Sequence, residues 1–162
     1  MGHADSAVWG VYPRRPLGQD ADIGNLLVFP EDPSRRGEDT LRVLVVDDHP
    51  AFRRALTSAL KMVKGIEVAG EAGGGREATD RARVDEPDLV LMDLSMPDFD
   101  GIEAMRRIHE DRPDLPVVIL TAHADPGVEK EAREAGASGF LAKGTALEDI
   151  VIVLHEATEG AA

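Results

Sequence analysis

Short apolar runs alternate with helical segments from Leu41 to near the end of the chain. This alternation predicts a parallel β-sheet whose strands are joined by crossover helices. The first, third and fourth runs are almost purely apolar, which is typical of strands that are covered on both faces. The five runs span residues 41–46, 66–69, 89–92, 117–120 and 140–142.

The second and fifth runs indicate the order of the strands. The second alternates between apolar and polar residues at Ile66, Glu67 and Val68, and the fifth is short and follows Gly139. Both patterns favour edge positions. We therefore predict the order 2-1-3-4-5 of a doubly wound, flavodoxin-like α/β fold, with a five-stranded parallel sheet and helices on both faces. In this order strands one and three are neighbours at the point where such sheets bind ligands.

Local signals mark the starts of two helices and the weakness of a third. Pro50 begins the first helix, where its missing N–H group costs nothing, and Asp100 is placed to cap another. The segment 126–135 offers few apolar side chains to the core, so we expect it to be the most loosely held helix. Two interpretations stay open: a weakly packed short helix, or a face that shifts on signalling.

The first forty residues differ from the rest of the chain. They contain four prolines and five glycines, and no helical or strand period is visible in them. We predict a disordered or loosely docked leader over residues 1–40 and a folded domain over residues 41–160. Alternatively, the aromatic residues Trp9, Tyr12 and Phe29 dock the leader onto the domain or onto a partner.

Composition excludes several classes of function. The 162 residues allow one core and include no cysteine, so neither disulfides nor thiolate metal sites are available. A net charge of −13 argues against direct binding of duplex DNA. No apolar stretch approaches the roughly 18 residues of a membrane span, and the N-terminus lacks a secretory pattern. These features predict a cytoplasmic protein with no membrane partner.

Three carboxylates stand at the ends of predicted buried strands. Asp47 and Asp48 follow the first strand, and Asp93 follows the third. Buried carboxylates are costly unless a cation or hydrogen bonds compensate them. Their clustering predicts a Mg²⁺ site that receives a phosphoryl group. Asp47 or Asp48 alone could instead cap the helix that begins at Pro50, whereas a loop follows Asp93.

Two further motifs allow more than one interpretation. The glycine run 73–75 is either a phosphate cradle at a helix start or, without the lysine of a P-loop, the turn before that helix. His49 and His123 lie near the predicted site and could join the aspartates around a transition metal. No histidine pair has metal-site spacing, and an all-oxygen site suits Mg²⁺ better.

Five polar residues stand in order at the ends of the predicted strands: Asp47, Asp48, Asp93, Thr121 and Lys143. The sequence around them resembles the receiver domain of bacterial two-component response regulators. The resemblance covers about residues 41–160. The Asp-Asp-His-Pro and Leu-Thr-Ala-His stretches are most similar to the subfamily with a LuxR-type helix-turn-helix output.

The resemblance implies a role for each of these positions. Asp93 would accept a phosphoryl group from a sensor histidine kinase, with Lys143 and Thr121 contacting the phosphoryl oxygens. Mg²⁺ would be the cofactor, and Thr121 would act as a switch together with Phe140, which would turn inward. The ligands of Mg²⁺ would be Asp47, Asp48, Asp93 and the Ser95 carbonyl.

The resemblance also implies how the signal ends and how copies associate. Ser95 and His123 would control the access of water to the phosphorylated residue, and the imidazole would lengthen the phosphoryl lifetime. Homodimers would form through the first and last helices. There Ile152 and Val153 are the interface candidates, since both fall away from the predicted core face of the last helix.

We therefore expect a phosphorylation-dependent switch that regulates transcription through an output domain not present in this chain, and that reaches DNA only through that domain. It would not be an enzyme beyond its own Mg²⁺-dependent phosphotransfer and slow self-dephosphorylation. Two alternatives stay open. One is a pseudo-receiver or stand-alone receiver that acts as a protein-interaction module. The other is a dehalogenase-type phosphatase, which would need an acid where Ser95 stands.

Overall fold

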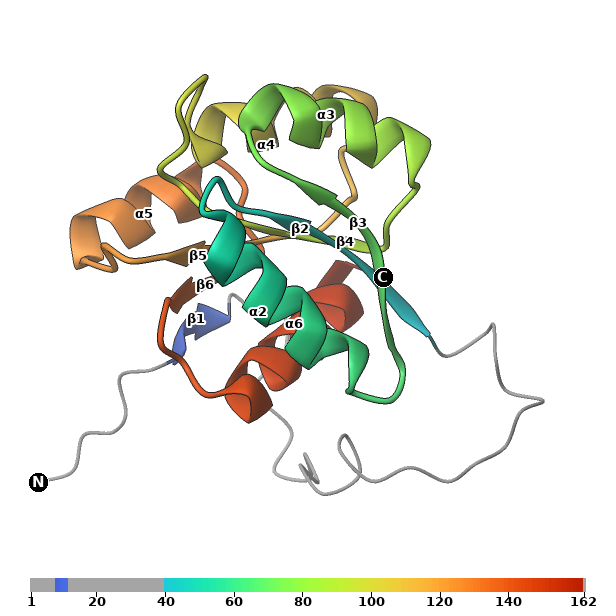
Figure 1. The fold of residues 1–162 in the computed structure, drawn as a ribbon. Helices are drawn as coiled ribbons and strands as arrows, with labels where there is room; N and C mark the ends of the chain where they lie inside the picture. Colours follow the sequence, from blue (N-terminus) through green and yellow to red (C-terminus); the bar gives the residue numbers. More distant parts are fainter. Residues whose placement is uncertain (1–7, 12–39, 162) are drawn as a thin grey trace, which may run out of the picture.

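Five parallel strands form the centre of the computed structural model, and helices lie on both faces of the sheet (Figure 1). The structure describes residues 8–11 and 40–161. The strands are β1 (Val8–Val11), β2 (Leu41–Val46), β3 (Ile66–Ala72), β4 (Leu89–Met92), β5 (Val117–Thr121) and β6 (Gly139–Ala142). The helices are α2 (Pro50–Lys61), α3 (Gly75–Val84), α4 (Gly101–Asp111), α5 (Pro126–Glu134) and α6 (Leu147–Ala161).

The parallel strands follow the order β3-β2-β4-β5-β6, which confirms the predicted order. β2 and β4 are direct neighbours, and Val46 pairs with Met92 at their carboxyl ends. The residues that follow these strands therefore leave the sheet side by side. This register places Asp47 next to Asp93.

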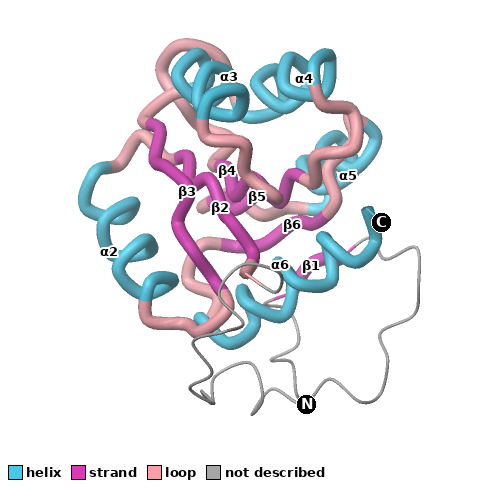
Figure 2. The backbone as a smooth tube through the Cα atoms, turned by 90° about the vertical axis from the view of Figure 1, so that its right-hand side faces the viewer, coloured by secondary structure: helices cyan, strands magenta, loops and turns pink. Residues whose placement is uncertain are grey.

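Two apolar layers hold the helices on the sheet: α2 and α6 cover one face, and α3, α4 and α5 cover the other (Figure 2). Full burial of each large aliphatic side chain contributes about 1.5–3 kcal/mol. Among the residues of α5 only Ala132 is buried, as its low apolar content predicted. The layers include Leu56, Leu60, Val151 and Leu154 on one face and Ala82, Ile102, Met105, Ile108 and Ala132 on the other.

The sheet has a sixth strand that the sequence analysis did not predict. β1 pairs antiparallel with β6, with Val8 opposite Leu141 and Val11 opposite Gly139. β6 is therefore not an edge strand, which corrects the edge position predicted for it, and residues 8–11 of the predicted leader pair with the sheet. A run of four residues is too short to display a period, and its partner lies far along the chain. The docking hypothesis for the side chains of Trp9, Tyr12 and Phe29 lies outside what the structure describes.

The burial of Val153 corrects one interface prediction. Its side chain is fully buried, and its Cγ1 atom lies 3.2 Å from the position that a Cβ atom would take at Gly139 of β6. The glycine leaves room for this valine, and β1 widens the sheet that α6 covers. Val153 therefore packs in the core, whereas Ile152 is only half-buried.

Acidic side chains cap α4 and α5 at the carboxyl edge of the sheet, and α2 begins there with a proline. α2 begins at Pro50, and the Asp100 carboxylate accepts a hydrogen bond from Glu103 N at the start of α4, both as predicted. Asp125 caps α5 by accepting from Gly127 N at 2.9 Å and Val128 N at 3.0 Å. These local caps satisfy amide groups that would otherwise have no partner.

The longest helix, α6, has 15 residues. None of the helices in residues 40–161 has both the length and the apolar character that crossing a membrane requires.

Candidate functional site

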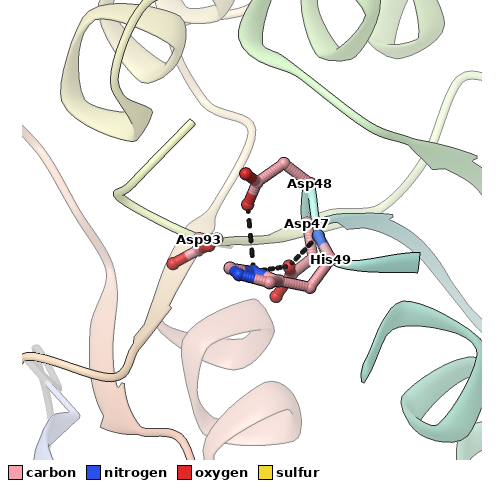
Figure 3. A group of neighbouring side chains, drawn as sticks. All are labelled: Asp47, Asp48, His49 and Asp93. Atoms are coloured by element: carbon pink, nitrogen blue, oxygen red, sulfur yellow. Dashed lines mark hydrogen bonds and ion pairs between the residues drawn. The ribbon is translucent and has the colours of Figure 1, made fainter. Parts of the chain in front are cut away.

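Three carboxylates meet where β2 and β4 end. Asp47 and Asp48 follow β2, and Asp93 follows β4. One ligand atom from each of these residues, together with one from His49, lies within 4.8 Å of all the others (Figure 3). Asp47 is 2% exposed and Asp93 is 3% exposed. The structure therefore brings the three acids of the sequence analysis together in one cluster, here called the crevice, in which Asp47 and Asp93 are buried and Asp48 is half-buried.

Lys143 follows β6 and enters this crevice from the other side. Its Nζ atom lies 2.7 Å from Asp47 Oδ2 and 3.2 Å from Asp93 Oδ2. Its backbone N–H donates to the carbonyl of Thr121 at 2.8 Å, which fixes the start of the side chain. The ammonium group also lies 4.6 Å from the centre of the Phe52 ring, a cation–π contact. Lys143 is therefore the cation that holds the crevice together.

The crevice shifts the pKa values of its groups. Burial raises the pKa of Asp93 above its ordinary value; the charge of Lys143 opposes this rise, and the charge of Asp47 adds to it. For Lys143, burial alone would lower the pKa, but the hydrogen bond to Asp47 and the charge of Asp93 raise it overall. The single ammonium group of Lys143 contacts two carboxylates, Asp47 and Asp93, and Asp48 adds a third acid to the crevice.

His49 contacts the acidic cluster from its exposed rim. Its Nδ1 atom lies 3.3 Å from Asp47 Oδ1 and 3.2 Å from Asp48 Oδ1, and its backbone N–H donates to Asp47 Oδ1 at 2.8 Å. His123 does not join this group in the described part of the chain. The two histidines are therefore not brought together, and the arrangement does not favour the transition-metal interpretation.

The residues present fit a hard divalent cation. The Asp48 Oδ1 atom is buried and accepts no hydrogen bond from any described residue, although His49 lies close to it. Such an oxygen is available as a metal ligand, and an oxygen-rich cluster with excess negative charge suits Mg²⁺. Ser95 lies beside this cluster, because its backbone N–H is 3.4 Å from Asp93 Oδ1.

The two predicted switch residues lie at different depths. Thr121 is buried at the end of β5, and its hydroxyl oxygen accepts from the backbone N–H of His123 at 3.2 Å. Phe140 is fully buried in the layer that α3, α4 and α5 cover. The sequence analysis expected Phe140 to turn inward on activation. In this structure its side chain is already inside.

Two residues in the first turn of α2 support the site and were missed by the sequence analysis. Phe52 lies under Lys143, and Arg53 Nη1 donates to the backbone carbonyl of Asp47 at 2.6 Å. Arg53 Nε also lies 3.3 Å from Glu71 Oε1. The available signal was positional, because a helix that starts at Pro50 places its first turn at the same edge of the sheet as the carboxylates.

The glycine run 73–75 forms the turn that leads into α3, with Gly75 as the first residue of the helix, and carboxylates accept hydrogen bonds from two of its amide groups. Asp98 accepts from Gly75 N at 2.9 Å and from Arg76 N at 2.8 Å, and Glu77 accepts from Gly73 N at 2.9 Å. Burial acts to raise the pKa of Asp98, but the backbone N–H groups outweigh it and lower the pKa to about 2. The turn interpretation therefore holds, and the phosphate-cradle interpretation is not favoured.

Comparisons with known proteins agree on one family. The family model of the response regulator receiver domain matches residues 43–155. The response regulator UvrY of Escherichia coli (strain K12) is 38% identical over 120 residues, which are 74% of this chain and 55% of that protein. The chain thus spans about half the length of the curated relatives it matches.

Solved structures give the same result. The signal receiver domain of the response regulator NarL from Mycobacterium tuberculosis has a TM-score of 0.70 and 32% identity, over 76% of this chain and 99% of that one. A two-component response regulator of the LuxR family from Aurantimonas sp. SI85-9A1 has a TM-score of 0.64 and 35% identity, over 70% of this chain and 86% of that one. These similarities confirm both the receiver resemblance and its LuxR-type subfamily.

Proposed function

This chain belongs to the response regulator receiver domain family, and from that premise we propose that it is a phosphorylation-dependent switch that accepts a phosphoryl group on Asp93 from a sensor histidine kinase. One observation carries the proposal. Asp93 lies buried in a carboxylate crevice, with the ammonium group of Lys143 3.2 Å from its side chain. A nucleophile and a cation for the incoming phosphate are thus already adjacent.

The chemistry follows from these side chains. The Asp93 carboxylate would attack the phosphorus of a phosphohistidine, so that an oxygen–phosphorus bond forms while the nitrogen–phosphorus bond of the donor breaks. Lys143 would move its charge from the Asp93 carboxylate to a phosphoryl oxygen. Thr121 would turn its hydroxyl from the His123 amide towards another phosphoryl oxygen. This hydrogen bond forms only in the phosphorylated state and so biases a two-state equilibrium.

The acidic residues would hold the cofactor. Asp48 and Asp93 would bind Mg²⁺ directly, Asp47 would assist, and the Ser95 carbonyl would complete the protein ligands. When bound, the cation supplies positive charge that offsets the carboxylates and the charge of the transferred group. The Asp48 Oδ1 atom, which is buried and accepts no hydrogen bond although His49 Nδ1 lies 3.2 Å away, supports this assignment.

Transmission of the signal would run through β5 and β6, which carry Thr121 and the buried Phe140. We place the output in a helix-turn-helix domain outside this chain, because the similar solved structure from Aurantimonas is a LuxR-family regulator. DNA would be reached only through that domain. A homodimer would form through α2 and α6 and would use Ile152. The protein would act in the cytoplasm, where a kinase would present its phosphohistidine.

Two alternatives differ in their chemistry. A pseudo-receiver would keep the fold as a protein-interaction module and take no phosphoryl group, yet the complete set of site residues favours the switch. A dehalogenase-type phosphatase would need a second acid at the position of Ser95. We therefore assign no enzymatic activity beyond phosphotransfer to Asp93 and slow self-dephosphorylation.

The test is phosphoryl uptake by the full chain from acetyl phosphate, measured as intact protein mass. With Mg²⁺ we expect the mass to rise by one phosphoryl group, and with Asp93→Asn or excess EDTA we expect no rise. Asp125→Asn is the matched control, because it removes an exposed carboxylate outside the crevice and should leave the uptake intact. Absence of uptake by the unsubstituted chain would overturn the proposal in favour of a pseudo-receiver.

A further inference from the structure

The loop between Asp93 and α4, residues 94–100, is here called the phosphoacceptor loop. It contains Ser95, whose carbonyl is a proposed Mg²⁺ ligand. Its two ends are held closely together: Gly101 N donates to the carbonyl of Leu94 at 2.9 Å. A Cβ atom at Gly101 would collide with the carbonyl oxygen of Asp93, so α4 begins directly against the backbone of the phosphoacceptor.

The middle of this loop is fixed to a different helix. The two oxygens of Asp98 accept hydrogen bonds from Gly75 N and Arg76 N at the start of α3, at 2.9 Å and 2.8 Å. The N-cap residue of α3 is Gly74, which has no side chain to supply a cap. Asp98 therefore caps α3 from a distant part of the chain, 23 residues beyond Gly75 and 22 beyond Arg76.

Phe99 adds an apolar contact beside this cap. A Cβ atom at Gly75 would come within 2.6 Å of the Phe99 ring, so the absence of a side chain at this position is what lets the loop lie against α3. The guanidinium of Arg107 in α4 lies 4.5 Å from the centre of the same ring, and Glu103 holds that guanidinium at 2.9 Å. The loop is thus attached to both α3 and α4.

A helix cap alone would not require this arrangement. α4 and α5 are capped by the residues directly before them, Asp100 and Asp125. Only at α3 does the cap come from the loop that contains Ser95, so that ordering the helix start also orders the loop. The backbone N–H groups at the start of α3 favour the charged form of this carboxylate and lower the pKa of Asp98 to about 2.

We propose that Asp98 is a positioning residue of the phosphoacceptor site: by anchoring the phosphoacceptor loop to α3, it holds the segment from Asp93 to Ser95 in the arrangement that binds Mg²⁺ and accepts the phosphoryl group. This inference rests on the proposed function and assigns a residue outside the crevice to it. Without the anchor the loop would populate further conformations. The apparent affinity for Mg²⁺ would fall in proportion to the population of the competent one.

The experiment compares Asp98→Ala with Asp125→Ala in the full chain. Both variants lose a carboxylate that accepts two backbone N–H groups at a helix start, but only Asp98 lies in the phosphoacceptor loop. Calorimetric titration with MgCl₂ should show about a tenfold loss of affinity for Asp98→Ala, at the low end for outer-shell partners of a metal site. Asp125→Ala should keep the affinity of the unsubstituted chain.

Asp98→Asn serves as the conservative variant. Its single amide oxygen still accepts one N–H group, so its Mg²⁺ affinity should lie between those of Asp98→Ala and the unsubstituted chain. Equal Mg²⁺ affinities for Asp98→Ala and Asp125→Ala would overturn the proposal and leave Asp98 as a helix cap only.

A second measurement does not depend on Mg²⁺. Amide hydrogen exchange of residues 94–100 in the metal-free protein should be faster in Asp98→Ala than in Asp125→Ala, and equal rates would overturn the anchoring role. If the unsubstituted chain binds no Mg²⁺ and takes no phosphoryl group, the proposed function fails. The exchange comparison still decides whether the anchor orders the loop.

Discussion

Asp93 in the crevice and Asp98 in the phosphoacceptor loop hold the same chemical group in opposite surroundings. Asp93 is buried beside Asp47, and its pKa is raised. Asp98 is exposed, accepts two backbone N–H groups, and its pKa falls to about 2. A carboxylate buried among like charges lowers stability and stays available for a cation or a phosphoryl group. A carboxylate satisfied by N–H groups stabilises the fold and is not available for chemistry.

The largest expected effect comes from removing the cation of the crevice. Lys143→Gln leaves Asp47 and Asp93 buried without a counter-charge, so we expect the free energy of unfolding without Mg²⁺ to fall by about 3 kcal/mol. Urea denaturation measures this change. Lys130→Gln is the control, because its 3.8 Å pair with Glu134 is exposed and should contribute little. Equal effects of the two variants would contradict the account of the crevice.

The next largest effect is the gain in stability on addition of Mg²⁺, which should depend on the carboxylates of the crevice. A ligand that binds only the folded state at a concentration of 100 times its Kd raises the free energy of unfolding by about 2.7 kcal/mol. We expect this gain in the unsubstituted chain and its loss in Asp48→Asn. Thermal unfolding across a MgCl₂ series tests it. A full gain in Asp48→Asn would show that the cation is held elsewhere.

Removing a carboxylate should change the free energy of unfolding in opposite directions in the phosphoacceptor loop and in the crevice. Asp98→Ala deprives α3 of its cap and should lower the free energy of unfolding by about 1 kcal/mol. Asp48→Ala relieves repulsion within the crevice and should raise the stability of the metal-free protein. Urea denaturation in EDTA compares both variants. A change of the free energy of unfolding in the same direction for both variants would contradict the difference between the two carboxylates.

Acidification should change the stability contributions of Asp98 and Asp93 in opposite directions, by a smaller amount than the substitutions above. The pKa of Asp98 is lowered from 3.8 to about 2, so its stabilising contribution is complete above 3.8 and is lost as the pH falls towards 2. The stability difference between the unsubstituted chain and Asp98→Ala should therefore shrink over this range. For Asp93 the pKa is raised, so protonation removes a penalty rather than a contribution. Urea denaturation at a series of pH values measures the difference, and a constant difference would contradict the assignment.

The smallest effect concerns the lifetime of the phosphorylated state, a property of the crevice rim. His123 and Ser95 are both exposed beside the buried Thr121 and Asp93. We expect the His123 imidazole to obstruct in-line attack by water, so His123→Glu should shorten the phosphoryl half-life several-fold. Decay of the phosphorylated band on a Phos-tag gel measures it. Unchanged or slower decay in the variant would remove this role from His123.

The sequence was sufficient for the five parallel strands and for the carboxylates of the crevice, because both depend on local signals. Apolar runs define β2, β4 and β5, and the acids that end them must lie together once β2 and β4 are neighbours. The missing parts depend on contacts between distant segments. β1 is only four residues long and is defined by its pairing with β6.

Side-chain contacts across the fold were equally invisible in the sequence. Val153 is buried because Gly139 makes room for it and β1 widens the sheet. Asp98 is one of two acids in its loop, and nothing local distinguishes it from Asp100 as the residue that reaches α3. The contact of Phe52 with Lys143 depends on how α2 lies over the sheet.

The pairing of β1 with β6 has a consequence for N-terminally truncated forms of this protein. A fragment that starts at Leu41 would expose a bare row of backbone donors and acceptors along β6, and such edges readily recruit strands from neighbouring molecules. Self-association of that fragment would then reflect the missing N-terminal residues. It would say nothing about pairing driven by phosphorylation.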